Sequence, residues 1–434
     1  MNARKPRWST LLRACLKTPF QRIFSAFPIM RRQHLLVNHC GFAASALPSL
    51  TEKSLENPPK AGFQTHPRIK VIHVISDTNI GGAGRCLLNL LECFDYETFD
   101  VQVIVPQGAL LVPEIERPGV KCIQVQGMSD KSFSASAIMG FVNLFRELKP
   151  DIVHTHAALS ARIAAKIAGA KVVHTRHSAF DQPQKMKTFP RKQINGFVNR
   201  MFGDCIISVS PAATANLVDT GTDPRMITLI YNGVKPLPRL TESERNELRA
   251  SMGFVPDDFV AAIIARLSPE KGHDCVLDAA KLAAGDGIKF AIAGSGVMDE
   301  HIRCRIEEEG ITNVRMLGFL QDVRQLENIM DVQVNASIGA EATSLSLLEG
   351  MSLGVPAVVS DSSGNPYVVH DGVSGLVVKA GSASELAQAL RQIKKDAELR
   401  QMLSSGALNE YEQRFTAERM TQETMNLYRR LMKV

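Results

Sequence analysis

The feature of this sequence that most constrains its fold is a regular alternation of short apolar runs with helix-like segments. From Ile69 onward, runs rich in Val and Ile such as IKVIHVIS and DVQVIVP are separated by segments whose apolar residues have helical spacing. A strand that is apolar on both faces must be covered on both faces, which is typical of a parallel sheet between two layers of helices. The alternation therefore predicts an α/β protein built on doubly wound parallel sheets.

The alternation occurs in two separate stretches of the chain. Six strand-like runs lie between Ile69 and Ser210, a polar connector follows from Asn232 to Gly253, and six further runs lie beyond it. We therefore predict two facing Rossmann-like domains, with ligands bound in a cleft beyond the carboxyl ends of their strands. The predicted segments are an N-terminal, acceptor-side domain at 67–234, a linker at 235–253, a second domain at 254–410 and a C-terminal helix at 411–434.

Residues 1–66 differ from the rest of the chain. The first 51 residues contain eight Lys and Arg and no Asp or Glu. A basic stretch before an apolar run resembles a signal peptide, but the basic part is too long and Asn38 and His39 interrupt the apolar part. We expect a disordered basic extension. A membrane-surface anchor and a start codon assigned too far upstream are the alternatives.

The charge and the cysteines narrow the functional classes. Of the formal charge of +6, +8 belongs to the first 51 residues, which leaves −2 for the other 383. Residues 69–230 carry +3 and residues 231–434 carry −6, so neither half has the basic groove of a nucleic-acid-binding protein. The eight cysteines contain no CxxC pair and no zinc-site spacing, which indicates reduced thiols in the cytoplasm.

A glycine-rich turn follows the first strand-like run. Gly81 and Gly82 stand in GGAGR and open a helical segment. Such a turn allows backbone N–H groups to approach a phosphate or a sugar closely. It is not a dinucleotide fingerprint, because Leu87 occupies the position of the last glycine. A tight turn that requires positive φ is the alternative interpretation.

Two cations meet at the end of the first strand-like run of the second series. Arg266 ends this run, and Lys271 follows in ARLSPEKG. Arg by its planar fork and Lys as a point charge can hold a diphosphate and neutralise leaving-group charge without a metal ion. Solvated surface charge is the alternative for either residue alone.

The segment from Glu341 to Glu349, EATSLSLLE, follows the run DVQVNAS. Ser344 can cap a helix that begins at Leu345, which leaves Glu341 in the preceding loop and Glu349 within the helix. Free N–H groups at the helix start attract an anionic diphosphate, with Glu349 at ribose distance and Glu341 facing a sugar. A surface glutamate and a capped helix are the alternative. That alternative leaves Glu349 in an apolar run, where a carboxylate requires a partner.

Two further features carry weaker signals. His154, His156, His174 and His177 lie on or beside two strand-like runs, but the chain has no Asp-x-Asp, and we expect no metal site. The segment 185–200 has five basic residues and no acidic residue. Its helical apolar face consists of Ile194, Phe197, Val198, Met201 and Phe202. We expect this face to pack on the sheet while the basic edge faces an anionic membrane surface, and a helix lying on lipid is the alternative.

The motifs occur in a fixed order between Ile69 and Leu431. They are GGAG, HTH at 154–156, HTRH at 174–177, NGV at 232–234, RLSPEK, AGSG, GFLQDV, the two glutamates eight residues apart, EGMSLGVPAVVSD and NPYVVHDGVSGLVV. In this order they resemble the family-four retaining glycosyltransferases, or group 1 glycosyl transferases, which have the two-domain GT-B fold.

The resemblance implies a role for each candidate residue. Arg266 and Lys271 would bind the donor diphosphate, Glu349 the ribose and Glu341 the transferred sugar; His177 would contact that sugar from the other domain; and Gly81, Gly82, Ser344 and Leu345 would complete the donor site. Arg266, Lys271, Glu341 and His177 form the expected catalytic set. The sequence departs from the family pattern at Ala342, where glycine is usual, and at Tyr367, where an acid is usual. These departures put the contacts of those two positions with sugar or acceptor in doubt.

The expected activity is therefore retaining transfer from a nucleoside-diphosphate sugar to a glycan or lipid-linked acceptor, without a cofactor or metal. Synthesis of bacterial lipopolysaccharide or another surface polysaccharide is the expected setting. The expected location is the cytoplasm, with peripheral attachment to the inner membrane. A nucleotide-sugar 2-epimerase of the same fold and a catalytically silent sugar-nucleotide-binding protein are the alternatives. The sequence leaves the base, the sugar and the acceptor open.

Overall fold

The structure, a computed structural model, describes residues 68–126, 128, 134–180, 182–339 and 341–434. The prediction for residues 1–66 lies outside the described residues. Both sheets belong to one compact unit of the chain, Gln64–Val434. None of the described helices has the length and apolar character that crossing a bilayer requires.

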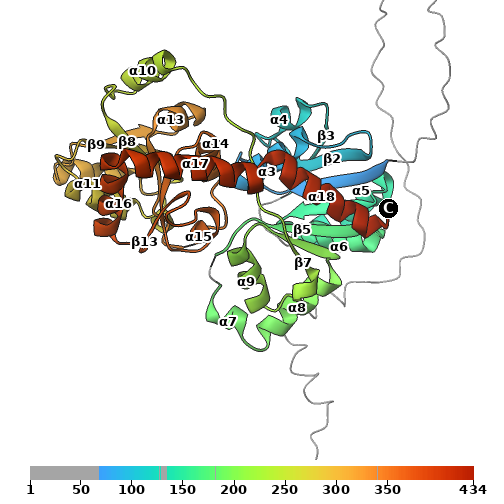
Figure 1. The fold of residues 1–434 in the computed structure, drawn as a ribbon. Helices are drawn as coiled ribbons and strands as arrows, with labels where there is room; N and C mark the ends of the chain where they lie inside the picture. The colour runs from blue at the N-terminus through green and yellow to red at the C-terminus, as the bar shows by residue number, and fades with distance from the viewer. Residues whose placement is uncertain (1–67, 127, 129–133, 181, 340) are drawn as a thin grey trace, which may run out of the picture. The chain divides into compact units, whose positions relative to one another are not determined.

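The first sheet is parallel throughout and has seven strands in the order β3-β2-β1-β4-β5-β6-β7. Figure 1 labels β2, β3, β5 and β7 of this sheet. The strands are β1 (Ile69–Ile75), β2 (Phe99–Pro106), β3 (Lys121–Val125), β4 (Ile152–His156), β5 (Lys171–Arg176), β6 (Cys205–Ser208) and β7 (Ile227–Leu229). In the sheet register, Val71 of β1 lies between Val101 of β2 and Ile152 of β4. The sequence pattern predicts only six of these strands, because β7 has three residues and no long apolar run.

The second sheet has six parallel strands in the order β10-β9-β8-β11-β12-β13. They are β8 (Phe259–Ile264), β9 (Ile288–Ala293), β10 (Val314–Gly318), β11 (Val332–Asn335), β12 (Ala357–Ser360) and β13 (Gly375–Val378). In both sheets the strand order reverses beside the first strand, at β1/β4 and at β8/β11. The carboxyl ends of such strand pairs are where doubly wound sheets bind ligands. The prediction of two doubly wound, Rossmann-like sheets is confirmed.

Helices cover both faces of each sheet. They are α3 (Gly82–Glu92), α4 (Val112–Glu116), α5 (Ala135–Leu148), α6 (Leu159–Ala168), α7 (Gln184–Lys187), α8 (Arg191–Met201), α9 (Pro211–Asp219), α10 (Glu242–Ser251), α11 (His273–Leu282), α12 (Asp299–Glu308), α13 (Arg324–Ile329), α14 (Leu345–Ser352), α15 (Asn365–Val368), α16 (Ala383–Lys395), α17 (Ala397–Arg414) and α18 (Ala417–Met432). Neighbouring residues of β1, Val71 and Ile72, enter different apolar clusters, because successive side chains of a strand point to opposite faces.

The end of the chain is two helices where a single C-terminal helix at 411–434 is predicted. Helix α17 continues to Arg414, and Thr416 then caps α18 by accepting a hydrogen bond from the N–H of Arg419 at 3.2 Å. Helix α18 lies alongside α3 (Figure 1), and its Met425 and Tyr428 are buried in the apolar cluster of the first sheet. The C-terminal residues therefore complete a core that is otherwise built by the N-terminal half.

The predicted apolar face of α8 is only partly packed. Val198 and Phe202 are half-buried, but the prediction is wrong for the other three residues of this face. Ile194, Phe197 and Met201 are 48%, 57% and 47% exposed. The opposite face packs inward through Gly196, where an added Cβ would lie 2.1 Å from a backbone oxygen. Beside it, the side-chain amide of Asn195 donates to a backbone carbonyl at 2.8 Å. Close backbone approach and polar contacts therefore decide which side of α8 is buried.

Candidate active site

A short turn after β8 places the two predicted cations. The 3-10 helix η2 (Pro269–Lys271) ends at Gly272, which has a φ of 72°. A Cβ on Gly272 would lie 2.0 Å from the carbonyl oxygen of Ala336, so only glycine allows this approach to the end of β11. Arg266 stays 65% exposed, with Glu270 3.6 Å away.

The half-buried Lys271 forms an ion pair with the buried Glu341. The ammonium group of Lys271 is 19% exposed, contacts Glu341 Oε2 and donates to it. Ser337 donates to the same oxygen at 3.1 Å, and the loop N–H of Gly364 donates to the Glu341 carbonyl at 2.8 Å. The structure thus brings Lys271 and Glu341 together, whereas no contact within the described chain joins Arg266 to either of them.

Helix α14 begins at Leu345, as the sequence predicts, but Ser344 does not cap it with its side chain. The Ser344 hydroxyl lies 3.1 Å from that of Ser346, which is also within 3.1 Å of the Ile264 carbonyl. The first N–H groups of α14 therefore have no side-chain acceptor at the N-cap position. Such a helix start suits an anion.

Glu349 has the partner that the sequence requires but does not identify. That partner is Glu327 on α13, which is 0% exposed, and neither of its carboxylate oxygens receives a hydrogen bond from a described N–H or O–H donor. Burial and the neighbouring Glu349 raise the pKa of Glu327 well above its ordinary value, and burial also raises the pKa of Glu349. Because two adjacent negative charges are unfavourable in this buried environment, we expect Glu327 and the half-buried Glu349 to share one proton.

This pair predicts a pH-dependent stability. The folded chain keeps a proton on Glu327 that the unfolded chain loses above pH 4.5, so the free energy of unfolding falls as pH rises through the raised pKa. Arg85 lowers and Asp322 raises the pKa of both glutamates, and Arg324 lowers that of Glu349. Glu327→Gln carries no titrating proton at this position. The melting temperature of the variant minus that of the wild type should therefore be larger at about pH 8 than at about pH 5. An equal difference at both pH values contradicts the shared proton.

The glycine-rich turn before α3 has open space around it. Gly81 has a φ of −87°, and neither Gly81 nor Gly82 is among the described glycines with positive φ. The tight-turn interpretation therefore does not account for them. A Cβ on Gly82 would meet no atom within 4 Å, whereas one on Gly81 would lie 3.0 Å from Asp77 Oδ2.

His177 ends a chain of hydrogen-bonded side chains. Its Nε2 lies 2.8 Å from His156 Nδ1, and His156 Nε2 lies 3.2 Å from His73 Nδ1. The Tyr428 hydroxyl lies 3.5 Å from His73 Nε2 and 2.6 Å from His154 Nδ1. Burial lowers the pKa of His177 to about 4 and that of His73 to about 3, so the rings are neutral at pH 7.

Three of these rings could in principle hold a metal ion. His73, His154 and His156 offer nitrogen atoms that all lie within 4.8 Å of one another. Their nitrogens are already engaged with Tyr428, with His177, with Thr175 or with each other. The contacts among the described residues therefore describe a hydrogen-bonded chain of neutral rings.

Sequence reasoning missed Glu327 and Tyr428. Glu327 stands between the apolar residues Leu326 and Ile329 just before β11, and a carboxylate in that pattern is a usable signal of a buried acid. Tyr428 lies on α18, and no local pattern indicates that this helix packs against the strands of the N-terminal half. The loop after β6 also contacts the loop before α14, because Thr343 donates to the carbonyl of Val209 at 3.1 Å.

Comparison with known proteins agrees with this architecture. Residues 80–236 match the model of "Glycosyltransferase Family 4", and residues 244–410 match that of "Glycosyl transferases group 1". The chain is 25% identical over 382 residues to an Escherichia coli UDP-Gal:alpha-D-GlcNAc-diphosphoundecaprenol alpha-1,3-galactosyltransferase, covering 84% of this chain and 97% of that protein. It is 27% identical to the Bacillus subtilis putative glycosyltransferase EpsD, covering 66% of this chain and 80% of the relative.

A solved structure has the same fold. Anabaena Alr3699/HepE in complex with UDP superimposes with a TM-score of 0.73 at 22% identity, covering 83% of this chain and 99% of that chain. The family models match the two halves of the chain in the order in which the two sheets occur. The chain belongs to the group 1 glycosyltransferases of the GT-B fold and is a glycosyltransferase.

Proposed function

We propose that the chain transfers a sugar from a nucleoside-diphosphate sugar to a lipid-linked or glycan acceptor, with retention of anomeric configuration and without a metal ion. The observation that carries this proposal is the part-buried Lys271–Glu341 ion pair near the start of α14. The UDP complex of the Anabaena protein and the UDP-Gal donor named for the Escherichia coli relative support a nucleotide donor.

The donor diphosphate is assigned to the cations and the helix start. Lys271, Arg266 and the free N–H groups at Leu345 place positive charge where the leaving diphosphate gains negative charge. This charge replaces what a metal ion would otherwise supply. Glu349 accepts hydrogen bonds from the ribose hydroxyls, and Glu341 orients the transferred sugar.

The reaction itself needs no separate protein base. The acceptor oxygen forms a bond to the anomeric carbon while the bond from that carbon to the phosphate oxygen breaks, and the electron pair leaves with the nucleoside diphosphate. The acceptor proton passes to the leaving phosphate oxygen on the same face. His177 follows β5 and Gly82 begins α3, and we assign them to the sugar and the acceptor.

The test of this proposal is product analysis. Thermal shift with UDP-, GDP- and ADP-sugars identifies the donor that stabilises the chain. Anomer-resolved NMR of the product should then show a new glycosidic bond with the configuration of the donor. An inverted bond contradicts retention, and an epimerised free nucleotide sugar supports the 2-epimerase alternative. Activity should survive exhaustive chelation of divalent cations.

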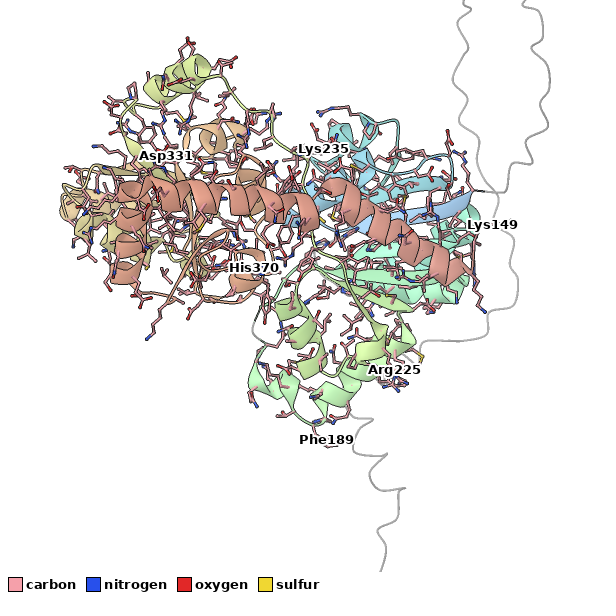
Figure 2. All side chains as sticks on the ribbon, in the orientation of Figure 1. Lys149, Phe189, Arg225, Lys235, Asp331 and His370 are labelled. Atoms are coloured by element: carbon pink, nitrogen blue, oxygen red, sulfur yellow. The ribbon has the colours of Figure 1, made fainter. Side chains whose placement is uncertain are left out.

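The proposed setting is synthesis of lipopolysaccharide or another surface polysaccharide at the cytoplasmic face of the inner membrane. The exposed side of α8 supports it, because Ile194, Phe197 and Met201 lie beside a cluster of basic residues. That cluster is Lys185, Lys187, Arg191, Lys192 and Arg200. Phe189, 79% exposed, lies at the outer edge of the same segment (Figure 2). Exposed aromatic and basic side chains together suit an anionic lipid surface.

We expect the full chain to sediment with vesicles that contain phosphatidylglycerol at low salt and to be released at high salt. Ile194→Ser with Phe197→Ser should reduce this binding by about tenfold or more, since two apolar side chains lose their burial in lipid. Val297→Ser, at an 86% exposed apolar residue next to the second sheet, is the matched control. Equal binding to neutral vesicles, or no binding to either, contradicts membrane attachment and favours a soluble acceptor.

A further inference from the structure

A cavity of about 530 Å³ lies at the carboxyl ends of β1, β4 and β5 in the first sheet. Residues that line it include Asp77, His156, Arg162, His174, Arg176 and His177. Asp77 is the one carboxylate among its described lining residues. The cavity sits at the β1/β4 reversal of strand order, the position at which doubly wound sheets bind ligands.

Arg162 is the first unusual group in this cavity. It is 6% exposed, yet its guanidinium donates only to neutral acceptors, the Phe202 carbonyl at 3.2 Å and Asn199 Oδ1 at 3.1 Å. No carboxylate among the described residues pairs with it. Burial without a counter-charge lowers the pKa of Arg162 to about 10.

Arg176 is the second unusual group in this cavity. It ends β5, and its Nε is buried and has no hydrogen-bond partner among the described residues. The described chain provides no ion pair for this guanidinium either, and burial lowers its pKa. Arg162, Arg176 and His174 line the same cavity. Burial lowers the pKa of His174, and the positive charges of Arg162 and Arg176 lower it further. His177 Nδ1, beside them, also lacks a partner within the described chain.

A buried cation, Arg162, and a half-buried cation, Arg176, have no carboxylate partner among the described residues. Such an arrangement is unfavourable unless a ligand neutralises the charges. Guanidinium groups bind phosphate oxygens through paired N–H donors. We infer that this cavity binds the phosphate ester of the acceptor, a diphosphate that links the acceptor sugar to a lipid, with Arg162 and Arg176 as its counter-charges. The inference rests on the proposed function and names the acceptor class that it leaves open.

The position of α8 favours a lipid as the source of that phosphate. Its inner side chains Asn195, Val198 and Asn199 line the cavity, while Ile194 and Phe197 are exposed on the outer side of the same helix. One helix thus separates an anion-binding cavity from an apolar, basic surface. A lipid-linked diphosphate has an anionic group that would match the cavity and, close to it, an apolar chain that would match the outer side of α8.

The experiment measures binding of three probes by calorimetry, without donor, to the full chain. The probes are a glycosyl diphosphate with a short alkyl tail, the neutral alkyl glycoside of the same sugar and tail, and inorganic pyrophosphate. Arg176→Gln should weaken binding of the alkyl diphosphate by about tenfold or more, because a charge-assisted contact is lost, and leave the neutral glycoside unchanged. Arg162→Lys, which keeps the charge but not the fork, should weaken it less. Arg225→Gln, at an 89% exposed residue paired with Asp223 (Figure 2), is the matched control.

Four outcomes overturn the inference. One is an equal loss of affinity for the neutral glycoside, which would indicate a merely structural role of Arg176. Another is unchanged binding of the diphosphate by Arg176→Gln. A third is loss of diphosphate binding in Lys271→Ala instead, which would place the probe in the donor site. Equal wild-type affinity for pyrophosphate and the alkyl diphosphate would reject a lipid-linked source. Because no transfer is measured, failure of the proposed reaction leaves all of these results interpretable.

Discussion

Lys271→Ala should lower kcat at saturating donor by about tenfold or more, since loss of one charged stabiliser of a leaving group costs a few kcal/mol. The structure adds a second reason. Glu341 is 7% exposed, and without Lys271 the one hydrogen bond that described residues still donate to its carboxylate comes from Ser337. Steady-state kinetics with donor and acceptor varied separately measures the effect. The melting temperature of each variant shows whether the fold is intact.

Two further variants show whether a loss of turnover in Lys271→Ala is specific to this lysine. Lys281→Ala removes a 48% exposed lysine whose partner is Glu309, and it should leave kcat unchanged. Lys271→Met with Glu341→Gln removes both partners of the ion pair. If Glu341 serves only to neutralise Lys271, the double variant should recover stability but not turnover. Turnover of Lys271→Ala close to that of the wild type removes the diphosphate assignment.

Glu349→Ala should reduce kcat/KM for the donor by about a hundredfold, because hydrogen bonds from two ribose hydroxyls to a charged acceptor are lost together. Donor hydrolysis and transfer should fall in parallel, which excludes a catalytically silent protein. The specific readout is discrimination between a nucleoside diphosphate and its 2′-deoxy analogue. Glu349→Ala should bind the two with nearly equal affinity, whereas the wild type should prefer the ribonucleotide.

Variants of Glu327 provide a second test of the ribose assignment. The raised pKa of Glu327 favours a protonated acid, which we expect to donate to Glu349 and to leave the Glu349 carboxylate free to accept from the ribose. Glu327→Gln keeps a donor and should retain the preference for the ribonucleotide, while Glu327→Leu should lose part of it. Glu308→Ala, at an exposed position of α12, is the matched control. A Glu349→Ala variant with wild-type discrimination contradicts the ribose assignment.

Much of the site is local in sequence and could be predicted from it. The cations of the β8 turn, the helix start at Leu345 and the loop position of Glu341 each follow from a strand, a turn and a helix that are consecutive in the chain. The partners of these residues could not be predicted in the same way. Glu327 meets Glu349 only because α13 and α14 pack on the same sheet. The capping role of Ser344 was predicted from its type, and its side chain instead contacts Ser346.

The sequence by itself determined every strand except β7, the parallel pairing and the order of the motifs, because apolar runs and helical spacing are properties of neighbouring residues. Only the tertiary structure decided which side of α8 is buried. Ile194 and Phe197 could be buried only against another apolar surface. The close backbone approach at Gly196 instead leaves them facing outward. The tertiary structure also decided that Tyr428 joins the histidines of β1 and β4, and that Arg162 and Arg176 share a cavity. Such contacts depend on the packing of distant elements, and no local pattern encodes them.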